Sequence, residues 1–151
     1  MKYLILDNIR SQYNVGAIFR TADAAGVAKL FLVGYTPAPI DRFGRPVPEL
    51  EKTSLGATKS VLWESVVDTL TLVKRLQAEG VTVVAVELTP TSVSLYDFVV
   101  PQNVAYIMGN EIEGVSPEVL AAVDVVVEIP MAGIKESLNV SVATGIILYA
   151  R

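Results

Sequence analysis

The chain has 151 residues, of which 52% are apolar, and this length and composition fit one domain with a single buried core. It contains no histidine and no cysteine, which excludes Ser-His-Asp triads, thiolate nucleophiles and zinc sites built from these side chains. Any catalysis must therefore use carboxylates, Lys, Tyr, Arg, hydroxyl groups or a bound cofactor.

Charge is unevenly distributed along the chain. The net charge of −4 comes from 12 basic and 16 acidic residues, but residues 1–75 hold ten Lys or Arg and seven Asp or Glu, whereas residues 76–151 hold two and nine. A polyanion would therefore bind the first half. No long uncharged apolar run and no signal peptide is present, so we expect a soluble, cytoplasmic protein that does not bind membranes.

Short strands alternate with helices along the chain. The expected elements are a strand at 3–6, a helix from about 14 to 25 ended by Gly26, a strand at 29–33, a long loop at 34–60, a helix from about 65 to 79 ended by Gly80, strands at 81–86 and 103–108, a short helix beginning at Ser116-Pro117, a strand at 124–129 and a terminal helix. Because the strands are almost continuously apolar, we expect them to be buried on both faces, as parallel strands are. The pattern predicts a three-layer α/β sheet.

The segment 34–60 is too long to be a bare connector. It holds four of the eight prolines together with Arg42, Arg45, Lys52 and Lys59. Segments of this kind are either functional loops or partly disordered ones.

No nucleotide fingerprint follows the first strand. Residues 109–116, GNEIEGVS, match the glycine spacing of a phosphate loop, but Val115 stands where the phosphate-binding Lys belongs. Glu111 and Glu113 would also place negative charge inside the cradle. This loop suits a cationic or neutral ligand better than a nucleoside triphosphate.

The stretch NVGAIFRTADAAG places polar residues on an otherwise apolar helix. Asn14 can cap this helix, and Gly16 permits close approach of another backbone. Arg20 lies among Ala, Ile and Phe, so we expect its guanidinium to be partly buried. Arg20 either forms a structural ion pair with Glu111 or Asp23, or takes part directly in the function of the protein.

The last helix also begins with polar side chains. Ser137 can act as its N-cap, but this leaves Asn139 within the first turn, where its amide competes with the backbone unless it has another role. Either capping or chemistry accounts for this group.

Three separated segments, NVGAIFRTADAAGV, IMGNEIEGVS and IPMAGIKESLNVSVATGIILYA, resemble the motifs of the SpoU/TrmH family of RNA ribose 2′-O-methyltransferases in the SPOUT superfamily. The resemblance runs from about Asp7 to the end and implies one catalytic domain over residues 1–151, without an RNA-binding extension. It also implies a deep C-terminal trefoil knot and a homodimer in which each site draws on both subunits. It implies S-adenosylmethionine (SAM) as the cofactor, bound in the knot, with no metal.

The resemblance also assigns roles to individual residues. Cofactor binding falls to Leu88, Gly109, Ile129, Met131, Ser137 and Leu138, where Gly109 would let the backbone approach the adenosyl group. The reactive residues are Asn14, Arg20, Glu111, Ser137 and Asn139. In this account Arg20 activates the 2′-hydroxyl, and we expect it to stabilise the forming alkoxide while phosphate or water takes the proton.

The RNA contacts are inferred from charge rather than from the family. The basic residues of the first half expected to meet phosphates are Arg10, Arg42, Arg45, Lys52 and Lys59. A chain with a calculated pI of about 4.8 is expected to bind RNA weakly, to prefer a small structured RNA such as tRNA, or to need a partner. Among RNA substrates we favour tRNA over rRNA.

Two other functions remain to be weighed. One is a non-catalytic protein that binds SAM or a nucleotide on the same fold, although such a protein does not need Arg20, Glu111 and Asn139 together. The other is a Rossmann or flavodoxin-like oxidoreductase, which would need the phosphate loop that is missing after the first strand.

Overall fold

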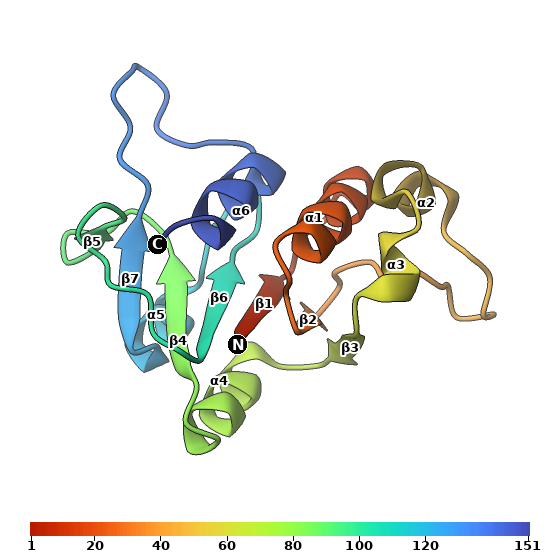
Figure 1. Ribbon diagram of the computed structural model, residues 1–151, viewed down its shortest axis with the longest axis horizontal. Coiled ribbons are helices and arrows are strands. Elements are labelled where there is room, and N and C mark those ends of the chain that lie inside the picture. Colours follow the sequence, from red (N-terminus) through yellow and green to blue (C-terminus); the bar gives the residue numbers. More distant parts are fainter.

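A seven-stranded parallel sheet forms the centre of the molecule, and the computed structural model describes residues 1–151 (Figure 1). The strand order is β3-β2-β1-β6-β4-β7-β5, and every neighbouring pair runs parallel. The strands are β1 (Lys2–Asp7), β2 (Lys29–Val33), β3 (Trp63–Val66), β4 (Thr82–Val86), β5 (Val93–Ser94), β6 (Val104–Met108) and β7 (Val125–Glu128). The helices are α1 (Gln12–Ala24), α2 (Pro48–Ser54), α3 (Ala57–Ser60), α4 (Thr69–Ala78), α5 (Pro117–Ala122) and α6 (Val140–Leu148).

Helices cover both faces of the sheet, so the predicted layered α/β architecture is confirmed. On one face Leu4 and Leu6 belong to a core shared with α1, α2 and α6. On the other face Ile5 belongs to a core shared with α4 and α5. Alternate residues of one strand serve opposite cores, because successive side chains of a strand point to opposite faces. This explains why the strands read as unbroken apolar runs.

Two of the expected elements are wrong in extent. The segment 34–60 is not only a loop, since it contains α2, which begins at Pro48, and α3. The helix expected from residue 65 begins at Thr69, after the edge strand β3. Asp68 caps this helix by accepting a hydrogen bond from the backbone N–H of Thr71 at 2.8 Å. The prediction did not use two helix-start signals, Pro48 in the first turn of α2 and the N-cap Asp68 of α4.

None of the helices combines the length and the apolar character that a membrane-spanning segment requires.

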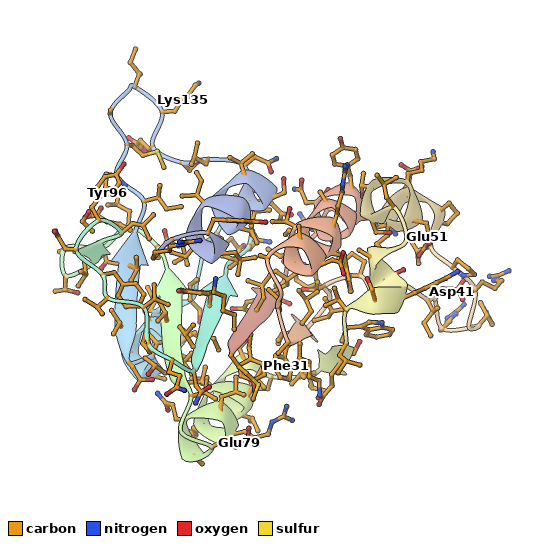
Figure 2. The ribbon with its side chains drawn as sticks, in the orientation of Figure 1. Phe31, Asp41, Glu51, Glu79, Tyr96 and Lys135 are labelled. Atoms are coloured by element: carbon orange, nitrogen blue, oxygen red, sulfur yellow. The ribbon has the colours of Figure 1, made fainter.

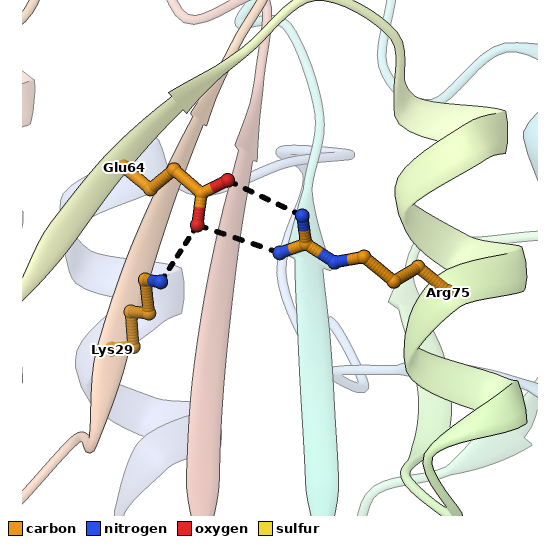
Figure 3. A network of polar contacts seen from close by, with 3 residues as sticks. All are labelled: Lys29, Glu64 and Arg75. Atoms are coloured by element: carbon orange, nitrogen blue, oxygen red, sulfur yellow. Dashed lines mark hydrogen bonds and ion pairs between the residues drawn. The ribbon is translucent and has the colours of Figure 1, made fainter.

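The sheet edge formed by β2 and β3 carries a network of charged side chains (Figure 3). The Glu64 carboxylate lies 2.6 Å from the Lys29 Nζ and 3.2 Å from an Arg75 Nη. The hydrogen bond from Lys29, followed by that from Arg75, outweighs partial burial and holds the pKa of Glu64 below its ordinary value of 4.5. The network joins the edge strands to α4.

Removing this carboxylate should weaken the fold in a pH-dependent way. The carboxyl group has a lower pKa in the folded than in the unfolded chain, so its stabilisation is present above the unfolded pKa and is lost as pH falls through the folded one. Glu64→Gln should lower the free energy of unfolding at pH 7 by about 1 kcal/mol or less, since the side chain is about a third exposed. The loss should vanish in acid.

Urea denaturation at neutral and acidic pH measures this difference. The matched control is Glu49→Gln, which breaks a more exposed pair with Lys52 and should change little. An equal loss of stability for Glu64→Gln at both pH values would contradict the role assigned to the charge.

Candidate active site

A cavity of about 920 Å³ opens beyond the C-terminal ends of β4, β6 and β7. Ligands of parallel α/β sheets bind at this edge, because the loops that follow the strands meet there. The walls come from the loop after β4, the loop after β6 and the segment between β7 and α6. All six residues expected to bind the cofactor line the cavity: Leu88, Gly109, Ile129, Met131, Ser137 and Leu138. That they bind a cofactor stays a prediction.

Asn110 fixes the shape of the loop after β6. Its Oδ1 accepts hydrogen bonds from the N–H groups of Ile112 and Glu113, both at 2.9 Å, and its Nδ2 donates to the Asn8 carbonyl at 2.9 Å. The shape of this loop also requires a glycine at position 109. A Cβ at this position would lie 2.5 Å from the backbone of Gly114. The glycine therefore lets the loop fold back on itself, and the close approach of this backbone to an adenosyl group stays a prediction.

Glu111 joins this loop to the start of α1. Its carboxylate accepts hydrogen bonds from the backbone N–H of Arg10 at 3.1 Å and of Ser11 at 3.3 Å. Desolvation raises the pKa of Glu111, but the hydrogen bonds from its own backbone, from Arg10 and Ser11 and from Asn14 outweigh this effect and hold the pKa below its ordinary value. The group is therefore an anion that accepts hydrogen bonds and has no proton to give at neutral pH.

Two asparagines from opposite ends of the chain meet beside Glu111. The Asn139 Nδ2 donates to the Asn14 Oδ1 at 3.4 Å. The Asn139 Oδ1 accepts from the backbone N–H of Ser141 at 2.9 Å and makes Asn139 the N-cap of α6. Neither Ser137 as the cap nor Asn139 inside the first turn is correct. Ser137 lies exposed in the preceding segment and lines the cavity.

Asn14 is not a cap either. Ser11 caps α1, accepting from the Asn14 backbone N–H at 3.1 Å, and the helix begins at Gln12. Asn14 is therefore buried in the first turn, with its side chain directed toward α6. Gly16 lies farther along the helix, where a Cβ would come within 2.2 Å of the Leu50 carbonyl oxygen, so the expected close backbone approach is confirmed.

Arg20 does not lie in the cavity. It follows Asn14 by six residues, a rise of about 9 Å along the helix axis. It is exposed rather than partly buried, and it forms an ion pair with neither Glu111 nor Asp23. Together with Tyr149 it lines a separate groove of about 570 Å³. Within one chain, the structure therefore brings together Asn14, Glu111 and Asn139 but leaves Arg20 apart.

The predicted RNA-binding residues are all exposed, and they are spread over the N-terminal half. Arg10 lies next to Glu111, and its guanidinium is 6.0 Å from the centre of the Tyr35 ring. Arg42 and Arg45 lie on one turn, and Arg45 pairs with Asp41. The remaining two are Lys52, which pairs with Glu49 and lines the groove of Arg20, and Lys59.

Two cavity residues were missed by the sequence reasoning. The Glu87 carboxylate accepts from the backbone N–H of Leu88 at 3.0 Å and of Val115 at 3.1 Å, which ties the loop after β4 to the loop after β6. Thr89 has a buried hydroxyl with no hydrogen-bond partner. The available signal was their position directly after the buried strand β4, where polar side chains reach the ligand edge of the sheet.

Comparisons with known proteins agree on one family. Residues 1–149 match the SpoU rRNA Methylase family, and the chain belongs to that family. It is 37% identical to a tRNA (guanosine(18)-2′-O)-methyltransferase of Aquifex aeolicus over 95% of this chain and 64% of that protein. It is 34% identical to a 23S rRNA (guanosine-2′-O-)-methyltransferase of Neisseria meningitidis over 96% of this chain and 55% of that protein.

Solved structures agree with this family. An AdoMet-bound rRNA methyltransferase from Sinorhizobium meliloti superimposes with a TM-score of 0.87 at 33% identity, covering 99% of this chain and 54% of that one. The chain thus spans somewhat more than half the length of these relatives. The resemblance found in the three sequence motifs is confirmed.

The cavity should not tolerate a side chain at position 109. Gly109→Ala should lower the free energy of unfolding by about 1–3 kcal/mol, because the new Cβ would overlap the backbone of Gly114 and force the loop open. The matched control is Gly133→Ala, where a Cβ meets nothing within 4 Å. Thermal unfolding of both variants tests this, and equal midpoints would show that the loop is not closely packed at Gly109.

Proposed function

We propose that this chain transfers a methyl group from SAM to the 2′-hydroxyl of a ribose in RNA. The observation that carries the proposal is the contact between Asn14 and Asn139 beside Glu111, at the rim of the cavity. Three segments far apart in the sequence converge there, and each supplies a group able to make hydrogen bonds. A purely structural contact does not need all three polar groups next to a large cavity.

The cavity fits the proposed cofactor. Its volume is within the range of small-molecule sites, and Ile129, Met131 and Leu138 offer apolar walls for an adenine ring. The unpaired Thr89 hydroxyl offers a hydrogen-bonding group in the same wall. Glu87 is one of several acidic residues around the cavity, which favour a cationic ligand. When bound, SAM supplies a methyl group on a sulfonium centre, which is already activated for displacement.

The residues of the chain then have to position the ribose and stabilise its developing charge. Asn139 and Asn14 orient the 2′-hydroxyl by hydrogen bonds, with Glu111 holding Asn14 in place. Ser137 contacts cofactor and ribose from the segment before α6. The guanidinium of Arg20 remains charged in proteins, so it acts by stabilising the forming oxygen anion while a phosphate or water accepts the proton.

Arg20 can stabilise this oxygen anion only if a second copy of the chain is present. We place it in the site of a partner subunit, in a homodimer formed by packing α1 and α6 against their counterparts. Exposed apolar side chains lie on α1 (Tyr13), on α6 (Val142 and Ile146) and at the C-cap of α6 (Tyr149), and of these Tyr13 and Tyr149 line the groove of Arg20. Burial of such a surface favours association. We also propose that the segment between β7 and α6 is threaded through the preceding loops as a trefoil knot.

We propose tRNA as the substrate in preference to rRNA. The net charge of −4 gives weak long-range attraction for a large polyanion, and ten of the 12 basic residues lie in the first half. Phosphates would meet some of these residues, namely Arg10, Arg42, Arg45, Lys52 and Lys59. The alternative, a protein that binds SAM or a nucleotide without catalysis, is favoured only by the separation of Arg20 from the cavity in one chain.

Methyl transfer to RNA is the direct test. The protein, incubated with labelled SAM and undermodified RNA, should label the tRNA fraction, and mapping should place the methyl group on a ribose. Asn139→Ala should reduce the label strongly because the hydroxyl is no longer oriented. The control Gln102→Ala changes an exposed amide away from the cavity and should be neutral. Binding of SAM without any labelled RNA would support the alternative, and label in 23S rRNA alone would refute the choice of tRNA.

Mixing two inactive variants tests whether the site is shared. Arg20→Ala should retain SAM affinity but lose at least ~100-fold in rate, as expected for loss of a preorganised charge. If Arg20 acts in the partner's site, subunit exchange between Arg20→Ala and Asn139→Ala leaves one intact site in each heterodimer, and activity should recover to about a quarter of the parent value. If Arg20 acts within its own chain, no site is intact and the mixture stays inactive.

A further inference from the structure

The turn at residues 40–46, termed the arginine turn, is held in one shape by Asp41. The Asp41 backbone N–H donates to the Arg45 carbonyl at 2.8 Å, and its carboxylate accepts from the N–H groups of Phe43 at 2.8 Å and Arg45 at 3.0 Å. Gly44 donates to the Asp41 carbonyl at 3.0 Å and has a positive φ of 77°, which glycine adopts without strain. The tip of the turn is therefore an ordered surface.

Phe43 projects from this tip into solvent. It is 66% exposed and belongs to neither hydrophobic core. The guanidinium carbons of Arg42 and Arg45 lie 4.8 Å and 4.9 Å from the centre of its ring. A single exposed apolar side chain is common on protein surfaces. What distinguishes Phe43 is that a rigid backbone presents it and that two cations accompany it.

The charge of the turn that has no partner within the protein is positive. The Asp41 carboxylate is occupied by backbone donors and by the Arg45 Nε at 3.1 Å, whereas Arg42 has no acidic partner. A flat ring with two guanidinium groups close to it suits a ligand that has both flat faces and negative charges. Single-stranded RNA has both, while an acidic peptide lacks the flat faces. A duplex keeps its base faces stacked inside.

We propose that Phe43 stacks on an unpaired base of the RNA, while Arg42 and Arg45 bind phosphates of the same strand. This inference rests on the proposed function in that its ligand is RNA. Stacking of a base on an aromatic ring is stronger than an exposed cation–π contact, so the base displaces a guanidinium from the ring face. The displaced guanidinium stays near the same RNA strand, where it can bind a phosphate.

The arginine turn lies away from the cavity. Figure 2 places Asp41 at the opposite end of the molecule from Tyr96 and from the Lys135 loop, which leads into α6. The turn of one chain therefore cannot touch a ribose held in the cavity of the same chain. It acts on RNA affinity, so its loss should raise KM and leave kcat unchanged.

A tryptophan at position 43 reports stacking directly. The parent chain has one tryptophan, Trp63, and Phe43→Trp adds a second on the turn. The probes are oligoadenylate, oligouridylate and the duplex formed by the two. The single strands should quench the added fluorescence and the duplex should not. The matched control is Tyr96→Trp, at an exposed aromatic position (84%) in the acidic half, where no probe should quench.

Affinity measurements complete the test. Phe43→Ala should bind the single strands at least about fivefold more weakly, whereas Phe43→Tyr should retain affinity because its ring still stacks. Unchanged affinity of Phe43→Ala, equal quenching at position 96, or no binding of any probe by the parent chain would overturn the proposal. Methyl transfer to RNA without quenching at position 43 would refute only the proposal that Phe43 stacks on a base. Quenching without methyl transfer would refute the proposed function and leave the stacking proposal intact.

Discussion

The hydrogen bonds that tie the loop after β6 to the start of α1 hold the candidate site together. β1 and β6 are neighbours in the sheet, so their C-terminal ends lie side by side, and the Glu111 carboxylate binds the two backbone N–H groups that precede α1. This sets the position of α1 over the sheet. The first turn of α1 then presents Asn14 to Asn139 at the start of α6. Packing of α1 and α6 in the same core brings together the two asparagines, which are 125 residues apart in the sequence.

Charge is separated in space as well as in sequence. The cavity is surrounded by acidic residues from the second half, whereas the arginine turn lies at the other end of the molecule (Figures 1 and 2). A small cationic ligand and a polyanion can therefore bind different regions without competing for the same charges. The sequence indicated that the acidic loop of residues 109–116 does not bind phosphate. In the structure this loop forms one wall of the cavity.

Much of the fold and the site was predictable from local patterns. Apolar runs gave the parallel strands, and glycine positions gave the ends of α1 and α4. Local reasoning failed where two signals compete. Residues 63–66 pair with β2 as an edge strand, so α4 begins at the Asp68 cap and not at residue 65. Asn139 rather than Ser137 caps α6, and its amide group also donates to Asn14. The contact of Gly109 with its own loop was not foreseen, because the atoms that a Cβ would strike belong to residues five and six positions away, in a loop whose shape the sequence does not reveal.

The sequence by itself determined the chemistry that is possible here. The lack of histidine and cysteine excludes whole classes of site, and the resemblance of the three motifs to a known family indicates the class of protein, because both depend on which side chains are present and in what order. Only the tertiary structure decided which of them meet. It joined Asn14, Glu111 and Asn139, and it separated Arg20 from them along the axis of α1. It also exposed Phe43 on a hydrogen-bonded turn with two arginines close to its ring, since neither burial nor the direction of a side chain can be read from its neighbours in sequence alone.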